Sequence, residues 1–111
     1  MNSLPLSLHI ENKAHADVAE IGFYYAQRNP AVEERFYQAF DKTINTLAHS
    51  PDLGERCRFR NPAVKGMRVW QVTGFPNHLI FYRADGGQLE ILRVLHAARD
   101  YAKAFDNAKQ S

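Results

Sequence analysis

Apolar residues alternate with polar ones near the start of the chain and then recur at helical spacing. The alternation from Leu4 to Ile10 predicts a half-buried strand. Pro5 cannot donate a ladder hydrogen bond, so this end of the strand is expected either at an edge of a sheet or frayed. The helical spacing that follows predicts two amphipathic helices, over residues 14–28 and 30–49.

Two asparagine residues mark where these helices are expected to begin. Asn12 is placed to cap the first helix, and Asn29 to cap the second, with Pro30 at the first helical position. Asn29 and Pro30 also end the first helix, because proline disfavours helical backbone at the preceding residue. Since the joint is so short, the two helices are expected to form an antiparallel hairpin.

The second half of the chain shows the period-two alternation of β-strands. It predicts strands over residues 68–73, 78–83 and 88–96. Residues 74–77 are expected to form the first turn, and the Asp-Gly-Gly sequence at 85–87 is a strong hairpin signal. The three strands are therefore expected to form an antiparallel meander, which the N-terminal strand completes as a sheet.

The strand over residues 88–96 is apolar on both faces, which is typical of a central strand covered on both sides. With strict alternation, Arg93 shares a face with Ile91, and His96 lies on the opposite face. A short amphipathic helix is expected over residues 99–108. The order of elements predicts an α+β fold: N-terminal strand, antiparallel helical hairpin, three-stranded antiparallel meander and short C-terminal helix.

The length of 111 residues suits a single domain, because a second hydrophobic core would not fit. Residues 50–67 are therefore expected to be a long basic loop inside this domain rather than a linker. The sequence contains no apolar run long enough to cross a membrane, and its start does not resemble a signal peptide. A cytoplasmic protein without membrane contact is expected.

Charge is distributed unevenly, although the net charge is only +2. Residues 1–55 carry four Lys or Arg against eight Asp or Glu, whereas residues 56–99 carry eight Lys or Arg against two acidic residues. Seven of those eight basic residues are arginine, whose planar guanidinium suits bidentate contact with phosphate or carboxylate. The basic half predicts an anionic partner, either nucleic acid or an acidic protein segment; a solvated surface without a specific role is the alternative.

Four sequence blocks carry a resemblance to a known family. They read Leu-Ala-His-Ser-Pro-Asp-Leu-Gly over residues 47–54, Gly-Met-Arg over 66–68, Leu-Ile-Phe-Tyr-Arg over 79–83 and Leu-Glu-Ile-Leu-Arg-Val-Leu-His-Ala-Ala-Arg-Asp over 89–100. With these blocks, most of the chain resembles the ParE branch of the RelE/ParE toxin superfamily. The resemblance implies a toxin of a bacterial type II toxin–antitoxin system, with the helical hairpin on one face of an antiparallel sheet.

For the ParE branch, the resemblance implies a role in plasmid stabilization, a cognate antitoxin, and inhibition of DNA gyrase by binding. Because fold alone does not assign a target, particular residues have to make the contact. The candidates for contact with gyrase, or with gyrase and DNA together, are the basic residues of the long loop and two strand arginines: Arg56, Arg58, Arg60, Lys65, Arg68 and Arg83.

The RelE branch implies a different activity, ribosome-dependent cleavage of messenger RNA. Metal-independent cleavage needs a base for the 2′-hydroxyl, an acid for the leaving oxygen, and cations on the phosphate. The residues that could supply these groups are Arg68, Arg83, Arg93, His96, Arg99 and Tyr101. Without a bulge, alternation separates Arg93 from His96, so a convincing acid–base pair is lacking and the sequence favours a binding toxin over an enzyme.

Several of these residues also have a structural interpretation. Arg93 is expected to pair with a carboxylate near the sheet, either Asp100 or Glu90, and His96 to be a hydrogen-bonded packing residue. Arg68 and Arg83 are harder to interpret in this way, because a buried cation needs a partner. The histidines are scattered, and the sequence has no common cofactor or metal motif, so neither a metal nor a cofactor is expected.

The antitoxin is expected to be a segment that is disordered alone and folds on binding. It is expected to bring acidic and apolar residues to the helical hairpin and to the basic side of the sheet. The sequence leaves open whether the toxin is a homodimer.

Overall fold

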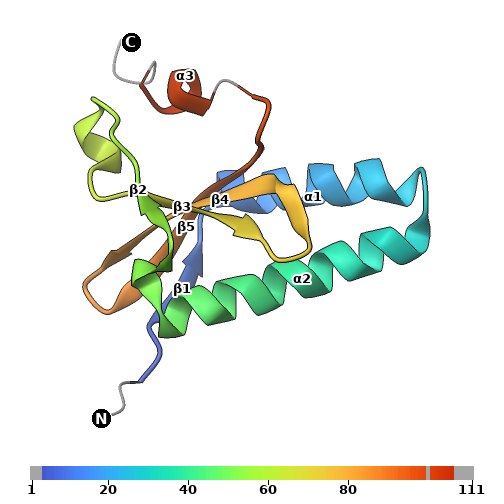
Figure 1. Ribbon diagram of the computed structural model, residues 1–111, viewed down its shortest axis with the longest axis horizontal. Coiled ribbons are helices and arrows are strands. Elements are labelled where there is room, and N and C mark those ends of the chain that lie inside the picture. Colours follow the sequence, from blue (N-terminus) through green and yellow to red (C-terminus); the bar gives the residue numbers. More distant parts are fainter. Residues whose placement is uncertain (1–3, 100, 107–111) are drawn as a thin grey trace.

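A helical hairpin covers one face of a five-stranded sheet in the computed structural model, which describes residues 4–99 and 101–106 (Figure 1). The hairpin consists of α1 (Asn12–Ala26) and α2 (Pro30–His49). The strands are β1 (Ser7–Ile10), β2 (Glu55–Arg56), β3 (Arg68–Val72), β4 (Phe75–Asp85) and β5 (Gln88–His96). They lie in the order β1-β5-β4-β3-β2, with β1 parallel to β5 and the other pairs antiparallel.

This architecture confirms the predicted α+β fold. The meander β3-β4-β5 is antiparallel, and the N-terminal strand completes the sheet by pairing with β5. Within the described residues, no helix is both long and apolar enough to cross a membrane.

The start of α2 follows the sequence closely, whereas the start of α1 does not. The Asn29 side chain accepts a hydrogen bond from the Ala31 amide at 3.0 Å, and Pro30 opens the helix as predicted. α1 already begins at Asn12, behind Glu11, whose side chain makes no capping bond. The prediction that Asn12 caps this helix is therefore wrong.

β1 is shorter than the alternation predicts. The Leu6 amide donates to the Ala48 carbonyl at the end of α2 (3.0 Å), and pairing with β5 starts only at Ser7. Leu4 is 88% exposed and Leu8 is 39% exposed. Of the predicted apolar face, Leu6 and Ile10 pack against the hydrophobic core.

The turn between β3 and β4 is tighter than predicted. Val72 pairs with Phe75, and Gly74 takes the positive φ of 83° that a two-residue turn requires. Pro76 and Asn77, predicted as turn residues, instead lie in β4 where its register against β3 shifts. A bulge accommodates proline because no ladder hydrogen bond is needed there.

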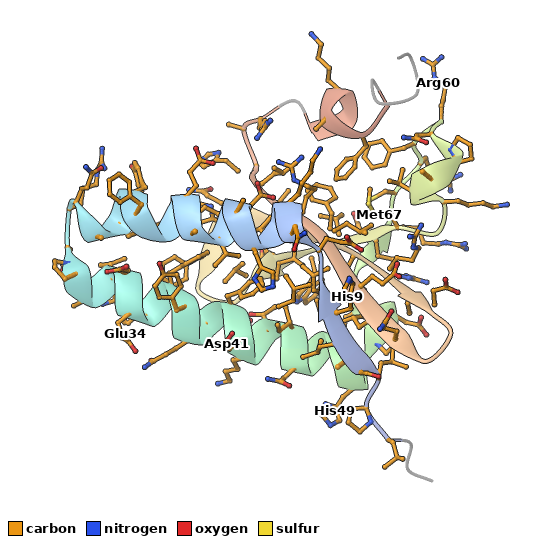
Figure 2. All side chains as sticks on the ribbon, turned by 180° about the vertical axis from the view of Figure 1, so that it is seen from behind. His9, Glu34, Asp41, His49, Arg60 and Met67 are labelled. Atoms are coloured by element: carbon orange, nitrogen blue, oxygen red, sulfur yellow. The ribbon has the colours of Figure 1, made fainter. Side chains whose placement is uncertain are left out.

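Hydrophobic clusters cover both faces of the sheet. On the helix side, Phe36, Phe40 and Leu47 of α2 pack against β4 and β5. On the other side, Met67 and Phe81 form a second cluster that the segment after β2 and the C-terminal helix cover. Figure 2 shows Met67 within the body of the protein.

A bulge in β5 changes which of its residues share a face. Phe81 pairs with Arg93 but Tyr82 pairs with Ile91, so Leu92 is an extra residue in β5. Ile91 and Val94 therefore both belong to the helix-side cluster. The prediction that Ile91 shares a face with Arg93 is wrong for this reason, because strict alternation assumed an unbroken strand.

The predicted long loop contains short elements and packs against the C-terminal helix. It holds two 3₁₀ turns, η1 (Pro51–Leu53) and η2 (Pro62–Val64), on either side of β2. The C-terminal helix α3 (Tyr101–Asp106) is shorter than predicted in the described residues, and residues 107 and 108 of the prediction lie outside them. Asn61 donates from Nδ2 to the Phe105 carbonyl at 2.9 Å and so joins the loop to α3.

Candidate functional site

The segment that runs from the last residue of β2 toward β3 presents basic side chains on the surface. We call residues 56–66 the basic loop; its four Arg and Lys side chains, Arg56, Arg58, Arg60 and Lys65, are all exposed. In Figure 2, Arg60 points away from the body of the protein beside α3, whereas Glu34 and Asp41 lie on α2 at a distance from it. Exposed basic side chains of the second half of the sequence thus gather in the basic loop, on a part of the surface separate from these two acidic residues of α2.

Arg68 and Arg83 hold the two ends of this region. Arg68 donates from Nη1 to the Gly54 carbonyl at 2.7 Å and lies 3.6 Å from an Asp52 carboxylate oxygen. Arg83 donates from Nε and Nη2 to Glu90 Oε1, at 3.1 and 2.9 Å, and from Nη1 to the Ala63 carbonyl at 2.8 Å. Their side chains remain 26% and 25% exposed, so both arginines combine an internal role with access from solvent.

The two arginines lie on opposite faces of the sheet. Arg68 is in register with Tyr82, whose ring belongs to the helix-side cluster, and Arg83 follows Tyr82 along β4. Because successive strand residues point to opposite faces, Arg83 projects toward the basic loop and Arg68 toward η1. Tyr82 also holds the η1 segment that Arg68 binds. Its hydroxyl donates to the Pro51 carbonyl (2.7 Å) and accepts from the Gly54 amide (2.8 Å).

Arg93 pairs with Asp17 of α1. Its Nε donates to Oδ2 at 2.7 Å and its Nη2 to Oδ1 at 2.9 Å, and these hydrogen bonds raise the pKa of Arg93. The structural role predicted for Arg93 is correct, but the predicted partners are not. Glu90 instead binds Arg83, and Asp100 lies outside the described residues.

A cleft of about 590 Å³ lies between α1 and the ends of β4 and β5. Ile21, Tyr24 and Tyr25 line it from α1, and His78, His96 and Arg99 line it from the other side. Two of the candidate catalytic residues, His96 and Arg99, therefore meet at one surface.

His78 is the buried histidine of this cleft. Its Nε2 lies 2.8 Å from the Tyr25 hydroxyl, and its Nδ1 has no hydrogen-bond partner among the residues that the structure describes. Burial, and to a lesser extent the neighbouring His96, lower the pKa of His78 below its ordinary value. Burial also raises the pKa of Tyr25, so the neutral forms of both side chains are favoured.

The hydrogen bond that His96 accepts disfavours a metal ion shared by the two histidines. Their rings are 5.6 Å apart between centroids and nearly perpendicular. His96 accepts the Ala98 amide at Nδ1, which places the proton of the neutral ring on Nε2 and leaves no nitrogen free for a metal. Among the described residues, no group of three or more His, Cys, Asp or Glu side chains could hold a metal ion.

Comparison with known proteins identifies the family. The sequence model described as "ParE toxin of type II toxin-antitoxin system, parDE" matches residues 8–101. The chain belongs to this family. It is thus a ParE-type toxin of a type II toxin–antitoxin system, as the sequence blocks predicted.

Two solved structures resemble this ParE-type toxin. A chain of the chromosomal ParDE system from P. aeruginosa has 22% identity and a TM-score of 0.68, over 85% of this chain and 98% of that one. A chain of the RelBE2 toxin–antitoxin complex from Mycobacterium tuberculosis has 18% identity and a TM-score of 0.57, over 84% and 99%. At these identities the likeness shows the fold. None of the curated proteins matches the chain significantly.

Two of the arginines proposed for RNA cleavage, Arg83 and Arg93, do not join His96 and Arg99 at the cleft of this ParE-type toxin. Arg83 and His78 are five positions apart on β4, roughly 17 Å at the rise of a strand, and His96 pairs with His78. Arg83 is thus far from His96, and Arg93 is bound to Asp17. Tyr101 opens α3, and its side chain lies outside the described part of the structure.

Sequence reasoning missed three residues of the cleft region: Asp17, Tyr25 and His78 had no assigned role there. Asp17 did carry a signal, because it lies on the stripe of α1 that also contains Ala14 and Ile21, where an acidic residue is out of place. An acid on an apolar stripe requires a buried partner. The sequence gives no means of choosing Arg93 as that partner.

Proposed function

We propose that this ParE-type toxin inhibits DNA gyrase by binding, and that a cognate antitoxin neutralises the toxin by binding to it. The observation that carries the first part is the position of His96 far from Arg83, together with the pairing of Arg93 with Asp17. A binding inhibitor does not require these side chains to cluster. The second part is supported by the family and by the similar chains, which come from toxin–antitoxin systems.

The basic loop is the proposed contact with gyrase. Its exposed side chains can reach phosphates or carboxylates of a gyrase–DNA complex, and arginine serves both by paired hydrogen bonds. Arg68 and Arg83 contribute at its borders: Arg83 binds the Ala63 carbonyl of the loop, Arg68 binds the Gly54 carbonyl just before β2, and each still exposes a quarter of its side chain. Since gyrase acts on DNA in the cytoplasm of bacteria, a cytoplasmic location follows from this proposal.

Two reactions run side by side test this function. The purified toxin is added to a gyrase supercoiling reaction and, at the same concentrations, to a translating extract. We expect supercoiling to fall with toxin concentration and messages to remain intact. Cleaved messages together with unaffected supercoiling would instead support the RelE-type activity and contradict the proposal.

The control for the first reaction is an arginine far from the basic loop. Arg35 is exposed on α2, and its replacement by alanine leaves the loop and its attachments unchanged. We expect the Arg35→Ala protein to inhibit supercoiling like the native toxin, and a protein with alanine at Arg56 and Arg58 to inhibit it less. Equal inhibition by both variants would exclude the basic loop as the contact.

A further inference from the structure

The outer edge of β5 is only partly covered by β1. Their pairing runs along Gln88–Ile91 and ends with the bond from the Glu11 amide to the Ile91 carbonyl at 3.0 Å. Beyond this bond the chain enters α1, and no strand of the described residues lies beside Leu92–His96. This uncovered edge borders the cleft, because Val94 and His96 both line it.

Asp17 already binds one backbone group of this edge, because the Val94 amide donates a hydrogen bond to its Oδ2 at 2.9 Å. The amide and carbonyl of one strand residue point to the same side, and alternate residues share that side. The Val94 carbonyl and both backbone groups of His96 therefore also face away from β4. The His96 carbonyl already accepts the Arg99 amide at 3.0 Å. Within the described part of the chain, one acceptor, on Val94, and one donor, on His96, are left for a partner.

These two groups suit a strand that runs parallel to β5. In a parallel pair, one residue of the added strand donates to residue i and accepts from residue i+2, which here are Val94 and His96. In an antiparallel pair, both groups of one residue are needed. Val94 has given its amide to Asp17, and His96 has given its carbonyl to Arg99. A short extended segment in line with β1 therefore fits this edge best.

The walls of the cleft suit apolar side chains on such a segment. In the added strand, the residue that bonds to Val94 and His96 has a neighbour on each side. These two neighbours lie beside Val94 and His96, and their side chains point toward the helix side of the sheet, where Val94 is part of the core. Ile21, Tyr24 and Tyr25 face them from α1, and Tyr24 is 49% exposed in the free chain. The volume of about 590 Å³ is within the range of roughly 300–1,000 Å³ of ligand-binding clefts.

The charges around the cleft favour a polypeptide over a nucleic acid. Glu20 and Arg99 are both exposed at the cleft and carry opposite charges, and the charge of Asp17 is matched by Arg93. A phosphate backbone requires an excess of cations, which this surface does not offer.

We propose that this cleft binds a short, extended, apolar segment of the antitoxin, which pairs in parallel with Val94 and His96 of β5. The proposal rests on the function proposed above, in which an antitoxin neutralises the toxin. It adds the place, the direction and the chemistry of one contact.

Amide hydrogen exchange of the full toxin, with and without its cognate antitoxin, tests the pairing directly. We expect the His96 amide to exchange at least about tenfold more slowly in the complex, because it becomes hydrogen-bonded. The Leu8 amide is the internal control. Since the Ser7 and Glu11 amides bond to the β5 side, the Leu8 amide faces outward from β1 and reports on the other edge available to a strand.

Two neighbouring aromatic residues provide matched variants for the affinity. Tyr24 lines the cleft, whereas Phe23, 63% exposed on the same helix, does not. We expect Tyr24→Ala to raise the Kd for the antitoxin by about tenfold, as loss of an aromatic anchor typically does. We expect Phe23→Ala to change it by less than about threefold.

The outcomes separate this inference from the proposed function. Tight antitoxin binding with an unprotected His96 amide and no effect of Tyr24→Ala would overturn the inference alone. Protection of Leu8 in place of His96 would also overturn it, because the antitoxin would then extend β1. His96 protection that grows with toxin concentration in the absence of antitoxin would assign the cleft to a second copy. No antitoxin binding at all would overturn both this inference and the proposed neutralisation by an antitoxin.

Discussion

Asp17 and Arg93 form a two-point ion pair between α1 and β5, although 76 positions separate them in the chain. The same carboxylate accepts a hydrogen bond from the Val94 amide. One side chain therefore pairs with a buried cation and also binds a backbone amide at the uncovered edge of β5. The pair thus positions α1 beside the end of β5 and forms one side of the cleft.

Replacing Asp17 by asparagine tests how much this contact stabilises the fold. Asn keeps the shape but leaves the guanidinium of Arg93 without its charged partner in a largely buried position. We expect the free energy of unfolding to fall by about 3 kcal/mol, as when one partner of a buried pair is removed. Urea unfolding of the native and Asp17→Asn proteins measures the difference.

The exposed acid Asp41 on α2 is the matched control for this measurement. We expect Asp41→Asn to change the free energy of unfolding by no more than about 0.5 kcal/mol, as is usual for surface substitutions. A loss of the same small size for Asp17→Asn would mean that the ion pair does not hold the helix to the sheet.

His78 predicts a pH dependence of stability. Its folded-state pKa lies below the ordinary value of 6.5, so the unfolded chain binds a proton at mildly acidic pH that the folded chain does not. The stability that the neutral His78 ring contributes is fully present above pH 6.5 and is lost as the pH falls below it. The slope from one such proton is at most about 1.4 kcal/mol per pH unit.

Unfolding free energies at pH 7.5 and at pH 5 check this dependence. We expect His78→Phe to flatten the profile, because its surroundings are aromatic and no proton is then taken up. A profile that stays equally steep in His78→Phe would show that other groups cause it.

The fold was predictable where local signals were strong. Asn29 and Pro30 mark the start of α2 by chemistry that acts within a few residues, and the structure begins the helix there. The meander was predictable for the same reason, because Gly86 and Gly87 allow the positive φ of a tight turn.

The cleft could not be predicted because it depends on non-local geometry. The extra residue Leu92 in β5 places Ile91 and Val94 on one face, and no sequence signal announces the bulge. The choice of Asp17 as the partner of Arg93 depends on where α1 crosses the end of that strand. Sequence reasoning foresaw that the arginine needs an acid, but offered acids that were close in the chain.

Arg83 predicts a link between loop attachment and toxicity. Alanine at this position removes the bonds to Glu90 and to the Ala63 carbonyl and takes away a candidate contact. Loss of one charge-assisted contact costs about 1.5–3 kcal/mol, which is about 10- to 150-fold in affinity. We expect Arg83→Ala to weaken gyrase inhibition at least about tenfold while the protein stays folded. Inhibition equal to that of the native toxin would remove Arg83 from the contact.

The most direct test of a binding mechanism is the growth inhibition caused by His96→Gln in cells without antitoxin. Binding requires no proton transfer, and His96 is exposed at the end of β5, so we expect this variant to stop growth as effectively as the native toxin. Loss of an acid or base typically lowers an enzymatic rate by about 10²–10⁴. A folded His96→Gln protein that still binds the antitoxin but no longer inhibits growth would contradict inhibition by binding and favour RNA cleavage.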